Sequence, residues 1–407
     1  MSPEAMTIEI RTCKEKEFAA GISPIWQYFG VEPDKEMNAS FRRILPPDRV
    51  HAAFDGKEVV GSTSSYPFEM TIPGGPVPVA GITLVGVRPT HRRQGILSKL
   101  IKQLLEGAHE RGEAIGSLWV AEETIYGRFG CGMASINGEI RIDREHTRYR
   151  KHWERLKASQ VSRDVALERF PSIYEQVAPR SPGMLSRTRD WWDTRRISDY
   201  PLDRHGAGPL VYVLFERDGE AVGYALYRHR TEFIENRFDS TLEVREAIGL
   251  DVAATAGVWR YLFDVDLMAH TRAEYIPIDH PLFFLLAEPR RLRYRVADGI
   301  WMRLIDVEAA LRLRSYASGE QLVLEVKDEF CPWNAGCYRI EEGEVSRAKG
   351  GADLRLEVRE LASTFMGGFS FAQLAGAGQV EELRPGGIAC ADRLFANSPA
   401  PWCPEMF

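Results

Sequence analysis

The sequence has few cysteines and lacks the spacings that commonly hold metal ions. Its 407 residues include 6 cysteines, none of them in a Cys-x-x-Cys pair, and there is no His-Glu-x-x-His segment. Zinc sites commonly use such spacings, so the sequence predicts no metal cofactor. Sparse, unpaired cysteines are typical of a reducing compartment, which favours a cytoplasmic protein with free thiols.

Long apolar runs and an excess of basic charge are also missing. No uncharged stretch is long enough to span a bilayer, and the first residues lack the basic and apolar segments of a signal peptide. The formal net charge is -6, so we do not expect the surface as a whole to attract nucleic acid or acidic membranes. With 44% hydrophobic and 27% charged residues, the composition is that of a globular chain with two or three domains.

One segment, Val85 to Ile96, combines a strand, a sharp turn and the start of a helix. Pro89 ends the strand because it lacks a backbone donor, and Gly95 lets the backbone approach a ligand closely. The free N–H groups of a helix start attract anions, and Arg92 and Arg93 add positive charge. The segment therefore predicts a phosphate or pyrophosphate site, with a solvated arginine pair as the alternative.

Strands and helices alternate around this segment. We expect strands at residues 7–10, 50–54, 59–71, 80–87, 115–120 and 135–142, and helical segments at 13–29, 36–44, 96–108 and 122–129. The strand at 135–142 is expected to close this unit. The order predicts a mixed α/β layer on a mostly antiparallel sheet.

A later part of the chain repeats a short motif from this unit. Asp-Gly-Lys-Glu-Val-Val-Gly at 55–61 resembles Asp-Gly-Glu-Ala-Val-Gly at 218–223, and a strand (241–250) and a helix (253–265) follow the later copy. Where the first copy has Arg-Arg-x-Gly, the second has only Gly-Leu-Asp at 249–251. We interpret this as a duplicated fold that has lost its anion site, with chance similarity over one hairpin as the alternative.

The C-terminal tail is unusually apolar. Trp402, Met406 and Phe407 lie beside Pro401 and Pro404, which stiffen the chain. Ordinary tails are polar and frayed, so this composition predicts a terminus that docks onto the rest of the protein.

The pattern Val-x-Val-x-Pro-x-x-Arg-Arg-x-Gly, from Val85 to Gly95, resembles motif A of the GNAT N-acetyltransferases. In that superfamily a strand splays and the pyrophosphate of acetyl-coenzyme A (acetyl-CoA) sits on the following helix start. Leu97 stands where a small residue is usual, which implies bulkier packing of the helix. A second family element, Tyr-x-x-x-Gly followed by an aromatic residue, begins at Tyr126 and has Cys131 in the aromatic position.

The full length resembles the enhanced intracellular survival (Eis) acetyltransferases within that superfamily. The resemblance rests on Thr-His-Arg-Arg at 90–93, Tyr-Gly-Arg-Phe-Gly at 126–130, Cys-Pro-Trp-Asn-Ala-Gly at 331–336, the degenerate second unit and the aromatic C-terminus. It implies an α/β chain with mixed sheets and a homo-hexameric assembly. The implied domains are an active GNAT domain at 1–145, a degenerate GNAT-like domain at 146–298 and a sterol-carrier-protein-like α+β domain at 299–407.

The resemblance also implies the activity, which is acetyl transfer from acetyl-CoA to amines such as aminoglycosides, polyamines or lysine-like groups. Tyr126 is the implied general acid, and the terminal carboxylate of Phe407 is the implied general base, in direct transfer within a ternary complex. A tyrosine holds its proton well above neutral pH and can donate it to a leaving thiolate, while a carboxylate can accept the ammonium proton. The alternatives are a packing tyrosine and a spectator carboxylate.

Further site residues are expected around these groups. The expected cofactor-binding residues are Val85, Gly86, Val87, Arg92, Arg93, Gln94, Gly95, Ile96, Leu97, Ser98, Ala121 and Glu122. The expected acceptor-binding residues are Trp26, Phe29, Leu84 and Glu405, with Tyr66 and Phe68 as further lining candidates, and Trp26 and Phe68 are equally expected in the core. The competing interpretation of the whole chain is a non-catalytic protein that binds acetyl-CoA or a lipid.

Overall fold

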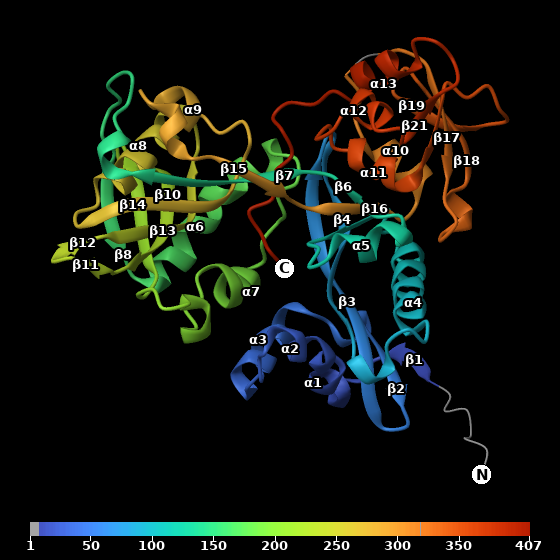
Figure 1. The fold of residues 1–407 in the computed structure, drawn as a ribbon, viewed down its shortest axis with the longest axis horizontal. Helices are drawn as coiled ribbons and strands as arrows, with labels where there is room; N and C mark the ends of the chain where they lie inside the picture. The colour runs from blue at the N-terminus through green and yellow to red at the C-terminus, as the bar shows by residue number, and fades with distance from the viewer. Residues whose placement is uncertain (1–7, 318) are drawn as a thin grey trace. The chain divides into compact units, whose positions relative to one another are not determined.

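The computed structural model describes residues 8–317 and 319–407, which form two compact units (Figure 1). Unit 1 comprises Met1–Ser135, Ile300–Ser398 and Met406–Phe407, and unit 2 comprises Ile136–Gly299 and Pro399–Glu405. Thr7, the expected start of the first strand, lies outside the described residues. Among the described helices, none is long and apolar enough to cross a membrane.

The main sheet of unit 1 has seven strands in the order β1-β2-β3-β4-β5-β16-β6. They are β1 (Glu9–Thr12), β2 (Val50–Asp55), β3 (Glu58–Ile72), β4 (Gly75–Val87), β5 (Ile115–Leu118), β16 (Trp301–Leu304) and β6 (Gly132–Met133). Only β4 and β5 pair in parallel among these described strands, and the other neighbours are antiparallel. The expected mixed layer with a mostly antiparallel sheet is therefore confirmed.

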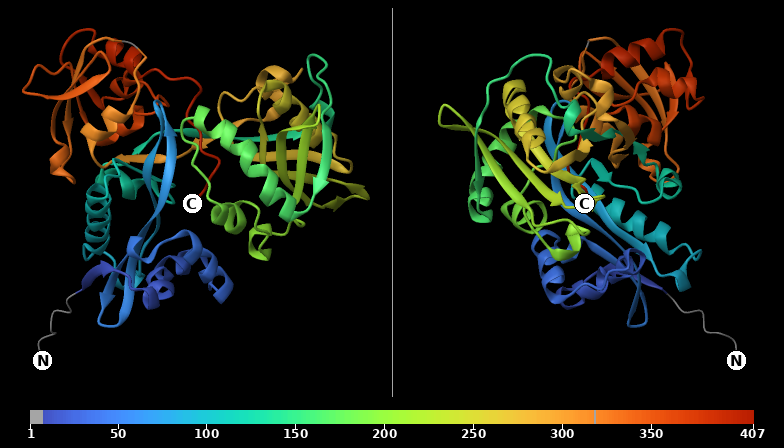
Figure 2. Two further views of the ribbon diagram at one scale, coloured as in Figure 1. Left: turned by 180° about the vertical axis from the view of Figure 1, so that it is seen from behind. Right: turned by 60° about the vertical axis from the view of Figure 1, so that its left-hand side comes forward.

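Helices cover both faces of this sheet. They are α1 (Phe18–Gly21), α2 (Ser23–Phe29), α3 (Lys35–Ile44), α4 (Ile96–Glu110) and α5 (Glu123–Tyr126). Figures 1 and 2 show α4 on one side of the sheet and α1–α3 on the other. The apolar face of α4, which includes Leu100 and Leu104, is buried against the strands, as its helical spacing predicts.

A second layer of unit 1 follows residue 304. Its five-stranded sheet has the order β19-β18-β17-β20-β21. The strands are β17 (Leu322–Lys327), β18 (Gly336–Glu341), β19 (Glu344–Ala348), β20 (Leu354–Glu357) and β21 (Val380–Glu382), and the helices are α10 (Val307–Leu313), α11 (Val358–Thr364), α12 (Phe371–Gly376) and α13 (Gly387–Phe395). Helix α11 packs on the main sheet at Gly132, where a Cβ atom would meet the Arg359 backbone.

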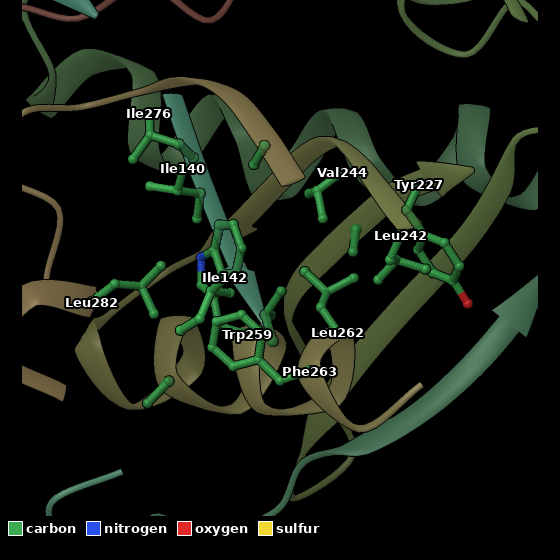
Figure 3. Packing of buried hydrophobic residues seen from close by; sticks show 14 of the residues in the cluster. Ile140, Ile142, Tyr227, Leu242, Val244, Trp259, Leu262, Phe263, Ile276 and Leu282 are labelled. Atoms are coloured by element: carbon green, nitrogen blue, oxygen red, sulfur yellow. The ribbon is translucent and has the colours of Figure 1, made fainter. Parts of the chain in front are cut away.

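Unit 2 holds a second seven-stranded sheet, in the order β15-β7-β14-β13-β10-β9-β8. The strands are β7 (Ile136–Asp143), β8 (Lys157–Val161), β9 (Val211–Arg217), β10 (Glu220–Arg230), β13 (Ser240–Gly249), β14 (Met268–Ile276) and β15 (Arg295–Asp298), with a small hairpin of β11 (Phe233–Ile234) and β12 (Arg237–Phe238). The helices are α6 (Arg163–Val177), α7 (Arg189–Trp191), α8 (Val252–Asp264) and α9 (Leu282–Leu285). Figure 3 shows Trp259 and Leu262 of α8 packed among Ile142, Leu242 and Val244 of the strands.

The two main sheets share one motif, so the predicted duplication is confirmed. In each, a hairpin (β2–β3 or β9–β10) precedes a strand, a helix and a second strand that pairs in parallel with the first. Their helix starts differ. Asp251 caps α8 by accepting a hydrogen bond from the Ala254 backbone and also pairs with Arg217, so a carboxylate already occupies the anion position.

The strand expected at 135–142 does not close the N-terminal sheet, so this prediction is wrong. Residues 136–143 do form a strand, but β7 lies between β15 and β14 in unit 2, and β16 takes the place beside β5 in unit 1. Alternating apolar residues indicate a strand and do not say which sheet it joins. The domain boundaries expected at residues 145 and 298 remain predictions, whereas the chain changes unit at residues 135/136 and 299/300.

Candidate functional site

The start of α4 has the features of an anion site. Gly95, at the N-cap position, has a positive φ of 75°, and no side chain caps the helix. A Cβ atom on Gly95 would meet nothing within 4 Å, so the backbone there is open. Arg92, Arg93 and Gln94 are exposed beside it. Uncapped N–H groups and two cationic side chains together suit a phosphate or pyrophosphate.

Neighbouring side chains shape this helix start. The guanidinium of Arg92 lies 4.8 Å from the centre of the Tyr28 ring, and the Tyr28 hydroxyl donates to the backbone carbonyl of Val87. Ile96 is buried and fixes the first turn of α4 in the core, while Leu97 and Ser98 are half-buried. Tyr28 was not predicted as a site residue because the sequence around it gives no signal beyond an aromatic residue in a helix.

Strands β4 and β5 diverge immediately before this turn. Their parallel pairing runs from Val79–Ile115 to Ile82–Leu118, and β4 then continues to Val87 without β5. Leu84 adopts a φ of 51°, a conformation that costs energy for a residue with a Cβ atom.

The divergence places the half-buried Val85 and the buried Gly86 and Val87 on the part of β4 that has left β5. A Cβ atom on Gly86 would lie 3.3 Å from Ile25 of α2, so this glycine allows α2 to approach closely. This stretch of β4 therefore has no β5 partner where the splaying of the motif A strand is expected.

Tyr126, at the end of α5, reaches the same part of β4. Its side chain is only 8% exposed and belongs to an apolar cluster that includes Ala80, Ile82 and Leu118. Burial raises the pKa of its phenol to about 12. Among the described residues, its hydroxyl has no hydrogen-bond partner. Tyr126 therefore keeps its proton near neutral pH and has that proton available to donate.

Phe407 docks on strand β3, as the apolar tail predicts. The centre of its ring lies 4.9 Å from that of Phe68 at 75° and 6.5 Å from that of Tyr66 at 81°. The strand register places Tyr66 opposite Gly81 of β4. A Cβ atom on Gly81 would lie 2.3 Å from the Phe68 ring, so the glycine makes room for this aromatic pair.

Tyr126 and Phe407 thus approach one short stretch of β4 through different neighbours. Ala80 and Ile82 belong to the cluster around Tyr126, and Gly81 between them lies against the aromatic pair that holds Phe407. Successive strand residues point to opposite faces, so Ala80 and Ile82 lie on one face of the sheet and Gly81 on the other. This stretch of β4 is also where its pairing with β5 ends.

The other expected cofactor residues lie near α5. Ala121 and Glu122 are exposed immediately before that helix, and the carboxylate of Glu122 accepts a hydrogen bond from the Thr124 hydroxyl at 2.8 Å.

The expected acceptor residues have different surroundings. Trp26 is half-buried with its ring 5.1 Å from that of Phe41, which fits the core interpretation, and Phe29 is 60% exposed on α2. Glu405 lies in unit 2, is 3% exposed, and pairs with Arg187 and Arg196. Because its carboxylate is buried and neutralised there, its surroundings give no support to a role in attracting a cationic acceptor.

Three families match successive parts of the chain. Residues 9–134 match an acetyltransferase (GNAT) domain, residues 183–313 match a second acetyltransferase (GNAT) domain, and residues 307–404 match a sterol carrier protein domain. These matches agree with the two related sheets and the separate C-terminal layer.

Relatives match over almost the whole length. An uncharacterized N-acetyltransferase of Streptomyces avermitilis is 35% identical over 412 residues, covering 99% of this chain and 100% of that protein. The N-acetyltransferase Eis of Mycobacterium tuberculosis is 31% identical over 385 residues, covering 89% of this chain and 90% of that protein. The crystal structure of Eis1 from Mycobacterium abscessus superposes with a TM-score of 0.87 at 29% identity, covering 98% of this chain and 100% of that one. The chain therefore belongs to the Eis family of GNAT N-acetyltransferases.

Proposed function

We propose that this N-acetyltransferase moves an acetyl group from acetyl-CoA to a primary amine, with Tyr126 as general acid and the Phe407 carboxylate as general base. The observation that carries the proposal is the docking of the last residue of the chain on Tyr66 and Phe68, against the stretch of β4 that Tyr126 also approaches. A C-terminal residue is ordinarily frayed in solvent, so the docking of the half-buried Phe407 on strand β3 needs a reason.

The start of α4 supports acetyl-CoA as the donor. Its open backbone at Gly95 and the exposed Arg92 and Arg93 suit the pyrophosphate, and the divergence after Ile82 supplies unpaired strand backbone for the rest of the molecule. When bound, acetyl-CoA supplies an acetyl thioester that an amine can attack.

The proposed chemistry starts from the ammonium form of the acceptor, so two protons must leave the nitrogen and one must reach the sulfur. The Phe407 carboxylate accepts the ammonium proton, directly or through a water molecule, which frees the nitrogen lone pair. As the new C–N bond forms, the C–S bond breaks, and Tyr126 donates its phenolic proton to the departing thiolate. The nitrogen releases its second proton to solvent, which leaves a neutral amide, and the Phe407 carboxyl group returns its proton to solvent. The phenolate then regains a proton from solvent. Each of these acid–base steps contributes on the order of 10²–10⁴ in rate.

The acceptor class follows from the resemblance to the family. We propose amines carried by aminoglycosides, polyamines or lysine-like groups, with Trp26, Phe29 and Leu84 as candidate contacts. A homo-hexameric assembly is proposed on the same ground, and a cytoplasmic location on the sparse, unpaired cysteines.

The test measures steady-state acetylation of an aminoglycoside and of spermidine, following thiol release. Tyr126→Phe and deletion of Phe407 should each lower kcat by about 10²-fold or more, while the KM for acetyl-CoA changes little. Tyr149→Phe is the control, because burial also raises the pKa of Tyr149, which is half-buried and lies in unit 2. Near-wild-type turnover in both site variants would overturn the proposed acid–base pair.

A further inference from the structure

Unit 2 has a strand divergence of its own. β13 and β14 pair in parallel from Ser240–Met268 to Val244–Ala273, and the pairing stops there although both strands continue. A cavity of about 180 Å³ lies in this region, lined by residues of both strands. In unit 1 the pairing of the equivalent strands, β4 and β5, also stops before β4 ends, although there β5 itself ends at Leu118.

The C-terminal tail, Pro399–Glu405, forms one wall of this cavity. The indole Nε1 of Trp402 donates to the backbone carbonyl of Tyr275 at 2.6 Å. Tyr275 lies on β14 beyond the last residue paired with β13, so the tail binds the part of the strand that the divergence has freed from β13.

Backbone contacts fix the tail further. The Trp402 N–H donates to the Pro182 carbonyl at 2.7 Å, and the Ala400 N–H donates to the Asp279 carboxylate at 2.9 Å. Gly183 lies directly beneath the tail, because a Cβ atom there would be 2.7 Å from the Trp402 carbonyl oxygen. The tail therefore fits a surface that leaves no room for even a methyl group at this position.

Glu405 ends the docked segment in a buried ion cluster. Its carboxylate pairs with Arg187 and, at 2.7 Å, with Arg196, and both arginines also pair with Glu246, at 2.8 and 3.1 Å. Arg196 also donates to the Pro404 carbonyl at 2.9 Å. The cluster pairs two carboxylates with two guanidinium groups, and a third guanidinium, that of the half-buried Arg245, lies within electrostatic reach and donates to backbone carbonyls. Pairing of this kind is how buried charges are tolerated.

Electrostatics favour this arrangement over a detached tail. Burial alone would raise the pKa of Glu405, but the charges of Arg187 and Arg196 outweigh it and hold that pKa below its ordinary value. Glu405 therefore stays ionised in the cluster. A tail that left the cluster would leave Arg187 and Arg196 with Glu246 as their one carboxylate partner among the described residues.

We propose that the β13–β14 divergence and this ion cluster form a positioning site for the catalytic C-terminus. Consecutive α-carbons are about 3.8 Å apart, so holding Glu405 confines the α-carbon of Phe407, two residues later, to within about 7 Å of that of Glu405. Trp402, Gly183 and Glu405 are then positioning residues. This inference rests on the proposed role of the Phe407 carboxylate as the base.

The inference gives the second GNAT-like unit a function. In unit 1 the strand divergence and helix start are proposed to take acetyl-CoA. In unit 2 the tail of the chain lies at the divergence, and the Asp251 carboxylate caps the helix start where a pyrophosphate would bind. The duplicated fold thus keeps a cavity at the point where its parallel strands stop pairing, and this cavity holds the tail, Pro399–Glu405.

The experiment uses the full-length protein and compares Gly183→Ala with Gly219→Ala. Both glycines have a positive φ, 95° and 88°, but a Cβ atom on Gly219 would meet nothing within 4 Å, so the control reproduces the backbone strain without touching the tail. Carboxypeptidase A measures tail release directly, because it removes Phe407 only from a detached C-terminus. We expect Gly183→Ala to lose Phe407 about tenfold faster than Gly219→Ala.

Trp402→Phe provides a milder second variant, which removes the bond to the Tyr275 carbonyl and keeps an aromatic ring. It should raise the release rate by about two- to tenfold, the effect of one lost hydrogen bond. In both variants kcat should fall while the KM for acetyl-CoA stays constant. If neither variant releases Phe407 faster than its control or the wild type, the positioning site is overturned. Faster release with unchanged kcat would support the anchoring and overturn Phe407 as the base.

Discussion

The ring of Phe407, the last residue of the chain, meets the ring of Phe68 nearly edge-on, with the ring centres 4.9 Å apart. Aromatic pairs favour this geometry because the positive edge of one ring faces the negative face of the other. Gly81 of the neighbouring strand makes the contact possible by leaving space for Phe68. The docking of the C-terminus is thus built into the strands of unit 1.

Replacing Phe68 should weaken this docking. Because an aromatic pair contributes about 0.5–1.5 kcal/mol, Phe68→Leu should lower kcat by about two- to tenfold with little change in the KM for acetyl-CoA. Phe54→Leu serves as the control, because Phe54 is a similarly buried phenylalanine on β2 of the same sheet. Equal losses of kcat in the two variants would show that the docked ring has no special role.

The arginines at the start of α4 should affect donor binding. Arg92→Ala and Arg93→Ala should each raise the dissociation constant of coenzyme A by about tenfold, because each removes a charged hydrogen-bond donor to phosphate. Lys99→Ala removes an exposed cation one turn further along the same helix. Titration calorimetry would contradict the assignment if Lys99→Ala weakened binding as much as either arginine variant.

Activity should persist at alkaline pH. Burial raises the pKa of Tyr126 to about 12, so its hydroxyl keeps the proton that it donates throughout the range where an exposed tyrosine would lose it. We therefore expect kcat, measured at saturating concentrations of both substrates, to show no decline between about pH 9 and 10.5. A descending limb centred near pH 10 that disappears in Tyr126→Phe would contradict the buried, neutral state of this tyrosine.

Stability should fall on the acid side because of His51. This histidine is buried on β2, and burial together with the nearby charge of Arg111 lowers its pKa to about 4. In the unfolded chain this histidine takes up a proton near pH 6.5, whereas in the folded protein it stays neutral until the pH is near 4. The stability that the folded state gains from a neutral His51 is therefore complete above pH 6.5 and is lost as the pH falls toward about 4. The loss is on the order of 3 kcal/mol.

Chemical denaturation at pH 7 and pH 4.5 measures this effect. In His51→Gln the free energy of unfolding of unit 1 should fall less between these two pH values than in the wild type. His280, which is buried in unit 2 with a pKa lowered to about 3, is unchanged in that variant and accounts for part of the remaining decline. An identical decline in His51→Gln and wild type would show that His51 titrates normally.

Local patterns were enough to predict the strand–turn–helix segment and the duplication. The strand, turn and helix around Gly95 are encoded within twelve consecutive residues, Val85 to Ile96. The two hairpins have similar amino-acid sequences. The docked terminus was also predictable, because Trp402 and Phe407 make an apolar tail. Each of these signals lies within a short stretch of the chain.

Long-range partners were not predictable from such patterns. The ion cluster joins Arg187 to Glu246 across 59 positions and Arg196 to the Pro404 carbonyl across 208 positions, and nothing near these residues marks them as partners. The insertion of β16 beside β5 has the same cause, since a four-residue strand such as Trp301–Leu304 does not specify its sheet.

The most direct test of the account adds one glycine after Phe407. The addition converts the terminal carboxylate into a neutral amide and keeps every side chain of the protein. We predict that the single-turnover rate of acetyl transfer falls by about 10²-fold or more with acetyl-CoA binding unchanged, whereas Phe407→Leu, which keeps the carboxylate, loses much less. A wild-type transfer rate in the extended protein would contradict the role of the terminal carboxylate as the base.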